Sequence, residues 1–136
     1  MAKKFKVEIV TPEKLVFSEE AESLIVPAER GYLGVLAGHA PLLCTLQPGE
    51  IRIRGDRGDL HFATSGGFME VTPKKASLLT ESAEEVAGID AARAQEAVDR
   101  AKERLASADK AVDKQRARAA LERAQNRLNL AAKYKK

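Results

Sequence analysis

The chain has 136 residues and a formal net charge of +3, which suits one compact domain or a small domain with an appendage. Its single cysteine, Cys44, excludes an intramolecular disulfide, and two histidines with one cysteine give no zinc-finger pattern. No apolar run approaches the ~18 residues of a membrane-spanning helix, and no signal-peptide segment opens the sequence. We therefore expect a cytoplasmic protein, or one docked onto a partner from the cytoplasmic side, that is not inserted in the membrane.

Composition changes sharply near residue 86. All five prolines and eight of the nine glycines lie in residues 1–85, whereas residues 86–136 contain fifteen alanines. Residues 1–85 carry 10 Lys and Arg against 13 Asp and Glu, and residues 86–136 carry 13 against 7. Because proline and glycine punctuate strands and turns while alanine favours helix, we predict an α+β protein. Its domains are expected at residues 1–86, built from strands, and at residues 87–136, built from helices.

Short strands are predicted throughout the first domain. Apolar and charged residues alternate over residues 5–9 and 50–54, and the alternation resumes at 60–63 after a turn. Many short strands with turn residues between them favour a sandwich or a barrel. In such a fold Phe68 and Val71 are expected in the core, and Gly66 and Gly67 where backbones approach closely. Further strands are predicted at 22–27, 42–46, 67–71 and 76–80.

The second domain is predicted to be a helical hairpin with a break near residues 106–109. Apolar residues step by four, three and four in both helices, which is the pattern of a seam between paired helices. A short connection and matching seams predict an antiparallel pair. Asp90 is the expected N-cap of the first helix, with Ile89 packing beside it as a hydrophobic staple. The seam residues are Ala94, Val98, Ala101 and Leu105 in the first helix, and Ala117, Leu121, Ala124 and Leu128 in the second.

A seam made mostly of alanine stabilises a hairpin only weakly. At roughly 25 cal/mol per Å² of buried apolar surface, each alanine contributes far less than a leucine would. The hairpin is therefore predicted to be an element that can open. A static hairpin that packs on the sandwich is the alternative, and composition does not decide between the two.

Arginines repeat along one flank of each predicted helix. Each lies one residue before a seam position, so an antiparallel pair would place six guanidinium groups along one edge. Nearby acids, Asp90, Asp99, Glu103 and Glu122, are expected to neutralise part of this charge. The excess favours an anion, because guanidinium binds phosphate and carboxylate in bidentate fashion. The six are Arg93, Arg100, Arg104, Arg116, Arg123 and Arg127.

Three anionic partners fit these arginines: nucleic acid, a nucleotide phosphate, and an acidic protein surface. A plain solvated face is the alternative. Nucleic acid is disfavoured because the helices lack aromatic residues for base stacking, apart from Tyr134 near the end of the chain. A basic hairpin on a β scaffold that binds nucleic acid stays open as an alternative function.

Three segments resemble one known family. They are residues 31–43 (GYLGVLAGHAPLL), residues 65–71 (SGGFMEV) and residues 89–94 (IDAARA). Their order, their spacing and the strands-then-hairpin layout are similar to the epsilon subunit of the bacterial and chloroplast-type rotary ATP synthase. The resemblance implies a β-sandwich of about ten strands followed by a two-helix domain.

The resemblance also implies a function. The subunit would catalyse nothing and need no cofactor. Its sandwich would hold the gamma subunit and rest on the c-ring, at the cytoplasmic face of a bacterial plasma membrane. Its hairpin would switch between a compact state and an extended state that reaches the alpha and beta catalytic subunits and inhibits ATP hydrolysis. The family's turn that faces the c-ring matches Glu29, Arg30, Gly31 and Tyr32, with His39 in the same motif.

In some family members ATP binds the compact hairpin, so ATP is expected here as a regulatory ligand. The sequence contains no G-x-x-x-x-G-K-[ST] motif, so such a site would sense the nucleotide without the usual machinery for hydrolysis. Asp90 and His39 each have a structural alternative, as a helix cap and as a residue that satisfies a turn. Matched by position, the residues implied for ATP are Glu84, Ile89, Asp90, Arg93, Ala94, Arg100, Arg123 and Arg127.

Overall fold

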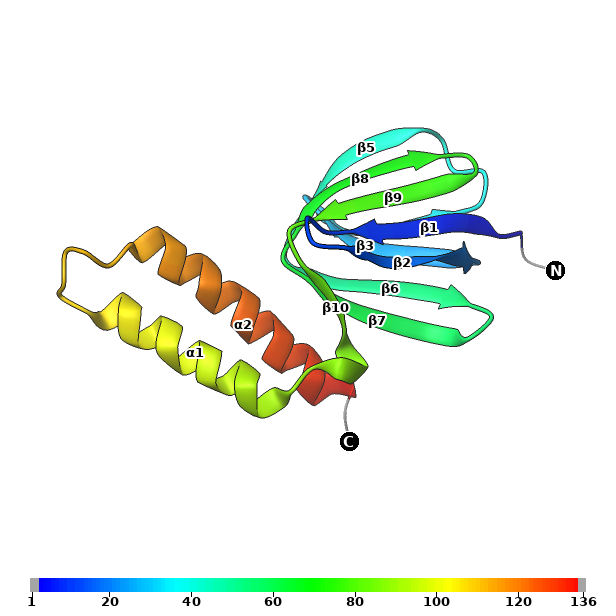
Figure 1. Ribbon diagram of the computed structural model, residues 1–136. Helices are drawn as coiled ribbons and strands as arrows, with labels where there is room; N and C mark the ends of the chain where they lie inside the picture. The colour runs from blue at the N-terminus through cyan, green and yellow to red at the C-terminus, as the bar shows by residue number, and fades with distance from the viewer. Residues whose placement is uncertain (1–2, 135–136) are drawn as a thin grey trace. The chain divides into compact units, whose positions relative to one another are not determined.

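The computed structural model describes residues 3–134, which form two compact units (Figure 1). The first ends at Glu85 and the second begins at Val86. Within the described residues, no helix has the length and apolar character needed to cross a membrane. The same residues contain no group of three or more His, Cys, Asp or Glu side chains placed to hold a metal ion.

The first unit consists of ten strands. They confirm the predicted sandwich of about ten strands, and those predicted from alternation lie within a few residues of their expected bounds. The strands are β1 (Phe5–Val10), β2 (Leu15–Ala21), β3 (Ser23–Ala28), β4 (Gly31–Leu36), β5 (Leu42–Leu46), β6 (Gly49–Gly55), β7 (Gly58–Thr64), β8 (Gly67–Thr72), β9 (Lys75–Thr80) and β10 (Ala83–Glu85).

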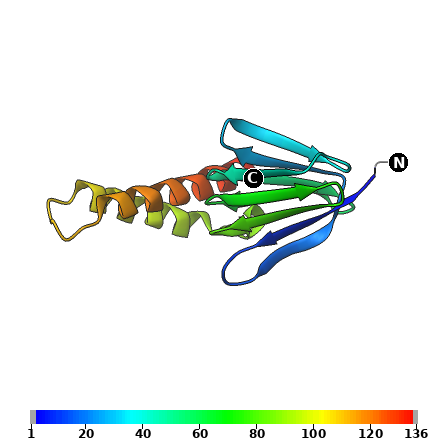
Figure 2. The same ribbon diagram turned by 90° about the horizontal axis from the view of Figure 1, so that it is seen from above.

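The strands form one sheet that folds over on itself. Its order is β10-β7-β6-β3-β5-β8-β9-β1-β2, and β4 pairs with β3 beside this path. Only Ala28 and Leu46 pair β3 with β5, so the sheet turns between its halves at this point. The far edge returns to β6, where Glu22 N–H donates to the Arg54 carbonyl at 2.7 Å and Arg57 pairs with Glu19. The result is close to a barrel, as Figure 2 shows from above.

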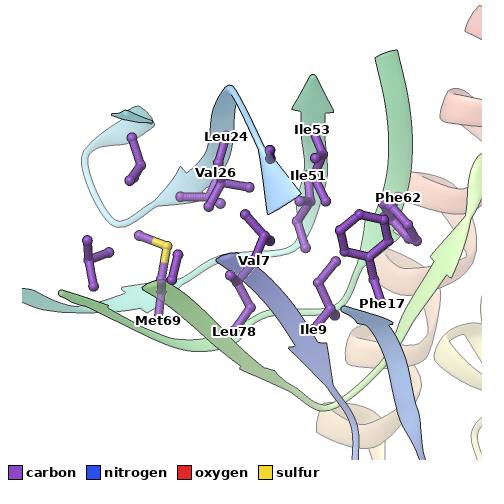
Figure 3. Packing of buried hydrophobic residues seen from close by; sticks show 14 of the residues in the cluster. Val7, Ile9, Phe17, Leu24, Val26, Ile51, Ile53, Phe62, Met69 and Leu78 are labelled. Carbon is purple, nitrogen blue, oxygen red and sulfur yellow. The ribbon is translucent and has the colours of Figure 1, made fainter. Parts of the chain in front are cut away.

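The core lies between the two halves of this sheet. Every second residue of β1 is buried, as the alternation over residues 5–9 predicts. Figure 3 shows Leu24, Val26, Ile51 and Ile53 from one half facing Val7, Ile9, Met69 and Leu78 from the other. The rings of Phe17 and Phe62 meet edge to face, with centroids 5.6 Å apart. This unit therefore has a complete apolar core of its own.

Two expectations within the sandwich had different outcomes. Val71 is buried in the core, whereas Phe68 is 56% exposed, so its predicted place in the core is wrong. Phe68 and Met69 are adjacent on β8 and must point to opposite faces, and Met69 takes the inner one. The predicted close approach at Gly66 and Gly67 is confirmed, because an added Cβ would lie 2.7 Å and 2.1 Å from backbone carbonyl oxygens.

The second unit is the predicted antiparallel hairpin (Figures 1 and 2). A 3-10 turn, η1 (Val86–Gly88), precedes α1 (Ala91–Ala106), and a short turn leads to α2 (Lys114–Tyr134). The Asp90 carboxylate accepts the Arg93 N–H at 3.2 Å, which confirms the predicted N-cap. Asp113 caps α2 in the same way, accepting the Arg116 N–H at 3.1 Å.

The alanines of the seam, more than its leucines, occupy the helix interface. Ala94, Val98 and Ala101 are buried on α1, and Ala117 and Ala124 are buried on α2. The three leucines of the predicted seam, at positions 105, 121 and 128, are only half-buried. Small side chains thus hold the centre of the interface, and leucines flank it. The hairpin accordingly gains less from burial than a leucine seam would supply.

Candidate functional site

The residues implied for ATP lie on both units. Glu84 is on β10 of the first unit, opposite Ala63 of β7. The others belong to the second unit: Ile89 and Asp90 precede α1, three residues lie on α1, and two lie on α2. Ile89 and Ala94 are fully buried, so any contribution they make is through packing. Arg93, Arg100 and Arg123 are exposed, and Arg127 is half-buried.

Three aspartates of the hairpin accept hydrogen bonds from backbone or amide groups. Asp90 and Asp113 cap the two helices, and Asp99 accepts the Gln95 side-chain amide at 3.0 Å. The expectation that nearby acids pair with the arginines is wrong for five of the six, because over residues 3–134 they form no ion pair within 4.0 Å. These five are Arg93, Arg100, Arg104, Arg116 and Arg123. Their guanidinium groups remain available to an external anion.

The residues expected to face the c-ring lie around strand β4. Glu29 and Arg30 form the exposed turn between β3 and β4, and Gly31 begins β4 with a φ of +118°, which favours glycine. Tyr32 is 61% exposed, yet its hydroxyl oxygen accepts the Glu50 N–H at 3.2 Å. Tyr32 thus also joins β4 to β6.

His39 is held by its own turn. Its ring Nδ1 lies 2.7 Å from the Ala40 carbonyl oxygen, which makes this nitrogen the donor. Its backbone N–H donates to the Leu36 carbonyl at 3.1 Å, and the neighbouring Gly38 N–H donates to the Pro73 carbonyl at 3.0 Å. His39 therefore has the structural role given as its alternative, since its ring satisfies a backbone carbonyl of the turn. A contact with another subunit would be an additional role.

The strands β5, β8 and β9 carry an apolar surface that the sequence analysis does not predict. Phe68 pairs with Leu79 across β8 and β9 and with Thr45 across β8 and β5, and Leu43 lies two residues from Thr45 on the same face. Leu43, Phe68 and Leu79 are 70%, 56% and 56% exposed. We call these three residues the apolar face. The sequence contains a sign of this surface, because each of the three residues has an apolar neighbour on its own strand. Adjacent residues of a strand point to opposite faces, so one of each two apolar neighbours must point outward.

A charged cluster lies on the outer side of β6 and β7. The Glu50 carboxylate is nearly buried, with His61 Nδ1 at 2.7 Å and the Arg52 guanidinium at 3.7 Å. Arg52 and His61 are register partners, and Glu50 lies two residues before Arg52 on the same side of β6. The contact between Glu50 and His61 therefore ties β6 to β7.

Comparisons with known proteins agree across both units. Residues 4–86 match the family described as ATP synthase, Delta/Epsilon chain, beta-sandwich domain, and residues 88–132 match its long alpha-helix domain. An ATP synthase epsilon chain of Koribacter versatilis is 50% identical over 107 residues, covering 77% of this chain and 74% of the relative. That of Syntrophobacter fumaroxidans is 44% identical over 133 residues, covering 98% and 99%.

Two solved structures share the fold. One is a chain of the Euglena gracilis mitochondrial ATP synthase, with a TM-score of 0.76 and 24% identity, covering 90% of this chain and 78% of that one. The other is a chain of the Tetrahymena thermophila mitochondrial ATP synthase central stalk and c-ring, with a TM-score of 0.55 and 17% identity, covering 99% and 98%. With both units matched and a relative 44% identical over nearly the full length, this chain belongs to the family of ATP synthase epsilon chains.

Proposed function

We propose that this chain is a non-catalytic subunit of the central stalk of a proton-translocating ATP synthase, where it couples the gamma subunit to the c-ring. The observation that carries the proposal is the family match over both units. The Tetrahymena neighbour, described as central stalk and c-ring, supports the same position. The relatives named above are bacterial, so the subunit would lie at the cytoplasmic face of the plasma membrane as a peripheral protein.

The apolar face supports docking of the sandwich onto another subunit. Leu43, Phe68 and Leu79 are neighbours on one outer surface of the sandwich and are each more than half exposed. Contiguous apolar surface of this kind marks a protein interface more often than isolated exposed residues do. We assign it to the gamma subunit. The exposed turn at Glu29 and Arg30 then serves the c-ring.

A paired substitution tests this docking. Phe68→Ser together with Leu79→Ser leaves the core intact, because both side chains point outward. We expect at least about a tenfold loss of affinity for the gamma subunit, since aromatic anchors dominate interfaces. In vesicles, ATP-driven proton pumping should fall in parallel. Leu36→Ser is the control, since Leu36 is 63% exposed on β4, which pairs with β3 in the other half of the sheet. Affinity and pumping equal to those of the control would contradict the assignment.

The hairpin, in this proposal, regulates ATP hydrolysis. An alanine seam stabilises the closed hairpin weakly, and five arginines make no ion pair over residues 3–134. The same cations can meet a nucleotide triphosphate when the hairpin is closed and acidic surfaces of the alpha and beta subunits when it is extended. A ligand shifts such an equilibrium only by its differential affinity for the two states.

ATP as a regulatory ligand is tested by calorimetric titration of the full chain with ATP and with ADP, each with and without magnesium. Micromolar binding that prefers ATP is the expected result. At a hundredfold excess over Kd it would stabilise the closed state by about 2.7 kcal/mol. Absence of binding at millimolar ATP would restrict the arginines to contacts with protein.

A further inference from the structure

The turn between α1 and α2 contains one lysine whose ammonium group has three backbone partners. Lys114, the first residue of α2, donates from Nζ to the carbonyl oxygens of Arg104 at 3.1 Å, of Leu105 at 2.8 Å, and of Ser107. An ammonium group has three N–H donors, so these carbonyls use all of them. We call Lys114 Nζ with these three carbonyls the turn latch.

The carbonyls of the turn latch lie at the place where α1 lacks hydrogen-bond donors. Arg104 and Leu105 belong to the last turn of α1, whose carbonyls receive no N–H from within the helix. Ser107 is the C-cap, and its backbone N–H donates to the Arg104 carbonyl at 3.3 Å, so Lys114 adds a second donor there. The C-terminal end of a helix also carries partial negative charge, which favours a cation. Lys114 therefore caps a helix that precedes it in the chain by seven to ten residues.

The remaining turn is ordered by its own side chains. Ser107 Oγ accepts the Asp109 N–H at 3.1 Å, and the Asp109 carboxylate accepts the Ala111 N–H at 2.9 Å. These bonds join neighbours in sequence. Within residues 86–134, the hydrogen bonds of Lys114 are the ones that connect the start of α2 with the last turn of α1.

We propose that the charge of Lys114 holds the hairpin closed at its turn, so that removing this charge lets the two helices separate from the turn end first. Because the alanine seam stabilises the closed hairpin only weakly, the hydrogen bonds of Lys114 are an important part of that stability. The effect of the turn latch on regulation rests on the proposed function, in which a hairpin that extends must first break the turn latch. The effect of the turn latch on the stability of the closed hairpin can be measured on the isolated chain.

Amide hydrogen exchange of the full chain tests the turn latch. In Lys114→Gln, exchange of the amides in the last turn of α1 and the first turn of α2 should accelerate by at least about tenfold, the effect of losing charged hydrogen bonds. Acceleration near Arg93, at the opposite end of α1, should be smaller. Lys110→Gln is the matched control, because Lys110 is exposed in the same turn and has no side-chain partner within residues 3–134.

Lys114→Arg keeps the test decisive if Lys114→Gln does not form a hairpin. A guanidinium group retains the charge, but its planar donors cannot converge on three carbonyls as an ammonium does. Exchange at the turn should then be faster than in Lys110→Gln and slower than in Lys114→Gln. Turn exchange in Lys114→Arg and Lys114→Gln that equals that of Lys110→Gln would overturn the proposal. The regulatory proposal has separate tests in ATP binding and hydrolysis, so the two can fail independently.

Discussion

At the scale of single residues, Gly67 shows why one position of the sandwich tolerates no side chain. It opens β8 with a φ of +152°, and an added Cβ would lie 2.1 Å from the Leu79 carbonyl oxygen and 2.8 Å from the Thr80 Cα. Both contacts are with backbone of the neighbouring strand β9, which cannot rotate away. The glycine is therefore required by the pairing of β8 with β9.

Gly67→Ala should lower the free energy of unfolding by about 2 kcal/mol or more, because the strand must shift to admit the methyl group. Urea-induced unfolding followed by circular dichroism measures this change. Gly34→Ala is the matched control, since Gly34 on β4 has nothing within 4 Å of an added Cβ. Its effect should stay within about 0.5 kcal/mol. Equal stability of the two variants would refute the steric explanation.

The arginines of the hairpin give a second prediction at this scale. If the guanidinium groups hold a triphosphate, Arg93→Ala and Arg127→Ala should each weaken ATP binding by about 1.5–3 kcal/mol, the value of a hydrogen bond to a charged group. Calorimetric titration measures the affinity. Arg118→Ala, which removes an exposed arginine of α2 outside the implied set, serves as the control. Wild-type affinity in both test variants would remove these residues from the proposed ATP site.

At the scale of elements, the parallel pair of β1 and β9 carries an ion pair that makes the sandwich sensitive to acid. Lys75 Nζ lies 2.7 Å from the Glu8 carboxylate, and this hydrogen bond lowers the pKa of Glu8 below its ordinary value of 4.5. A carboxyl group with a lowered pKa in the folded protein stabilises the fold above its ordinary pKa. The contribution is lost as the pH falls through the lowered value.

Glu8→Gln should therefore be less stable than the wild type near neutral pH, and the difference should shrink as the pH falls below about 4.5. Thermal unfolding over a series of pH values measures the loss of stability near neutral pH and its decrease in acid. Glu13→Gln removes an exposed carboxylate from the turn between β1 and β2 and should change neither. A difference between Glu8→Gln and wild type that persists unchanged to about pH 2 would contradict the pairing.

Alternation of polar and apolar residues predicted the strands that are half-buried, and it failed where that pattern is weak. β5 has the bounds predicted for it, Leu42–Leu46. Alternation does not predict β2, β4 and β10, because β2 ends in a charged segment, β4 contains two glycines, and β10 has three residues. The outward position of Phe68 was not predicted, because alternation does not say whether Phe68 or the adjacent Met69 faces the core.

Spacing predicted the helices more completely, since a 3.6-residue period over two turns or more has few alternatives. The N-cap at Asp90, the break between the helices and the buried alanines were all expected. The partners of Lys114 were not, because they depend on the path of the turn and not on a periodic pattern. The same limit applies to the hydrogen bond of Tyr32 with Glu50, which joins strands 18 residues apart.

At the scale of the whole molecule, the two units differ in what stabilises them. The first has a large apolar core, an excess of acids and several ion pairs that connect distant strands. The second has a seam of small residues, an excess of basic residues and a turn held by Lys114. A unit with its own core suits the proposed docking, and a weakly held unit suits the proposed switching, because elements that move come from the less stable parts of a fold.

If the hairpin restrains ATP hydrolysis, the ATPase rate of the catalytic head should depend on whether it is reconstituted with the full chain or with residues 1–86. The shorter chain keeps all ten strands and the core of the sandwich, so it should still dock. We predict a higher rate with the shorter chain, with docking confirmed by co-purification with the gamma subunit. Equal rates for the two docked forms would show that the hairpin does not inhibit.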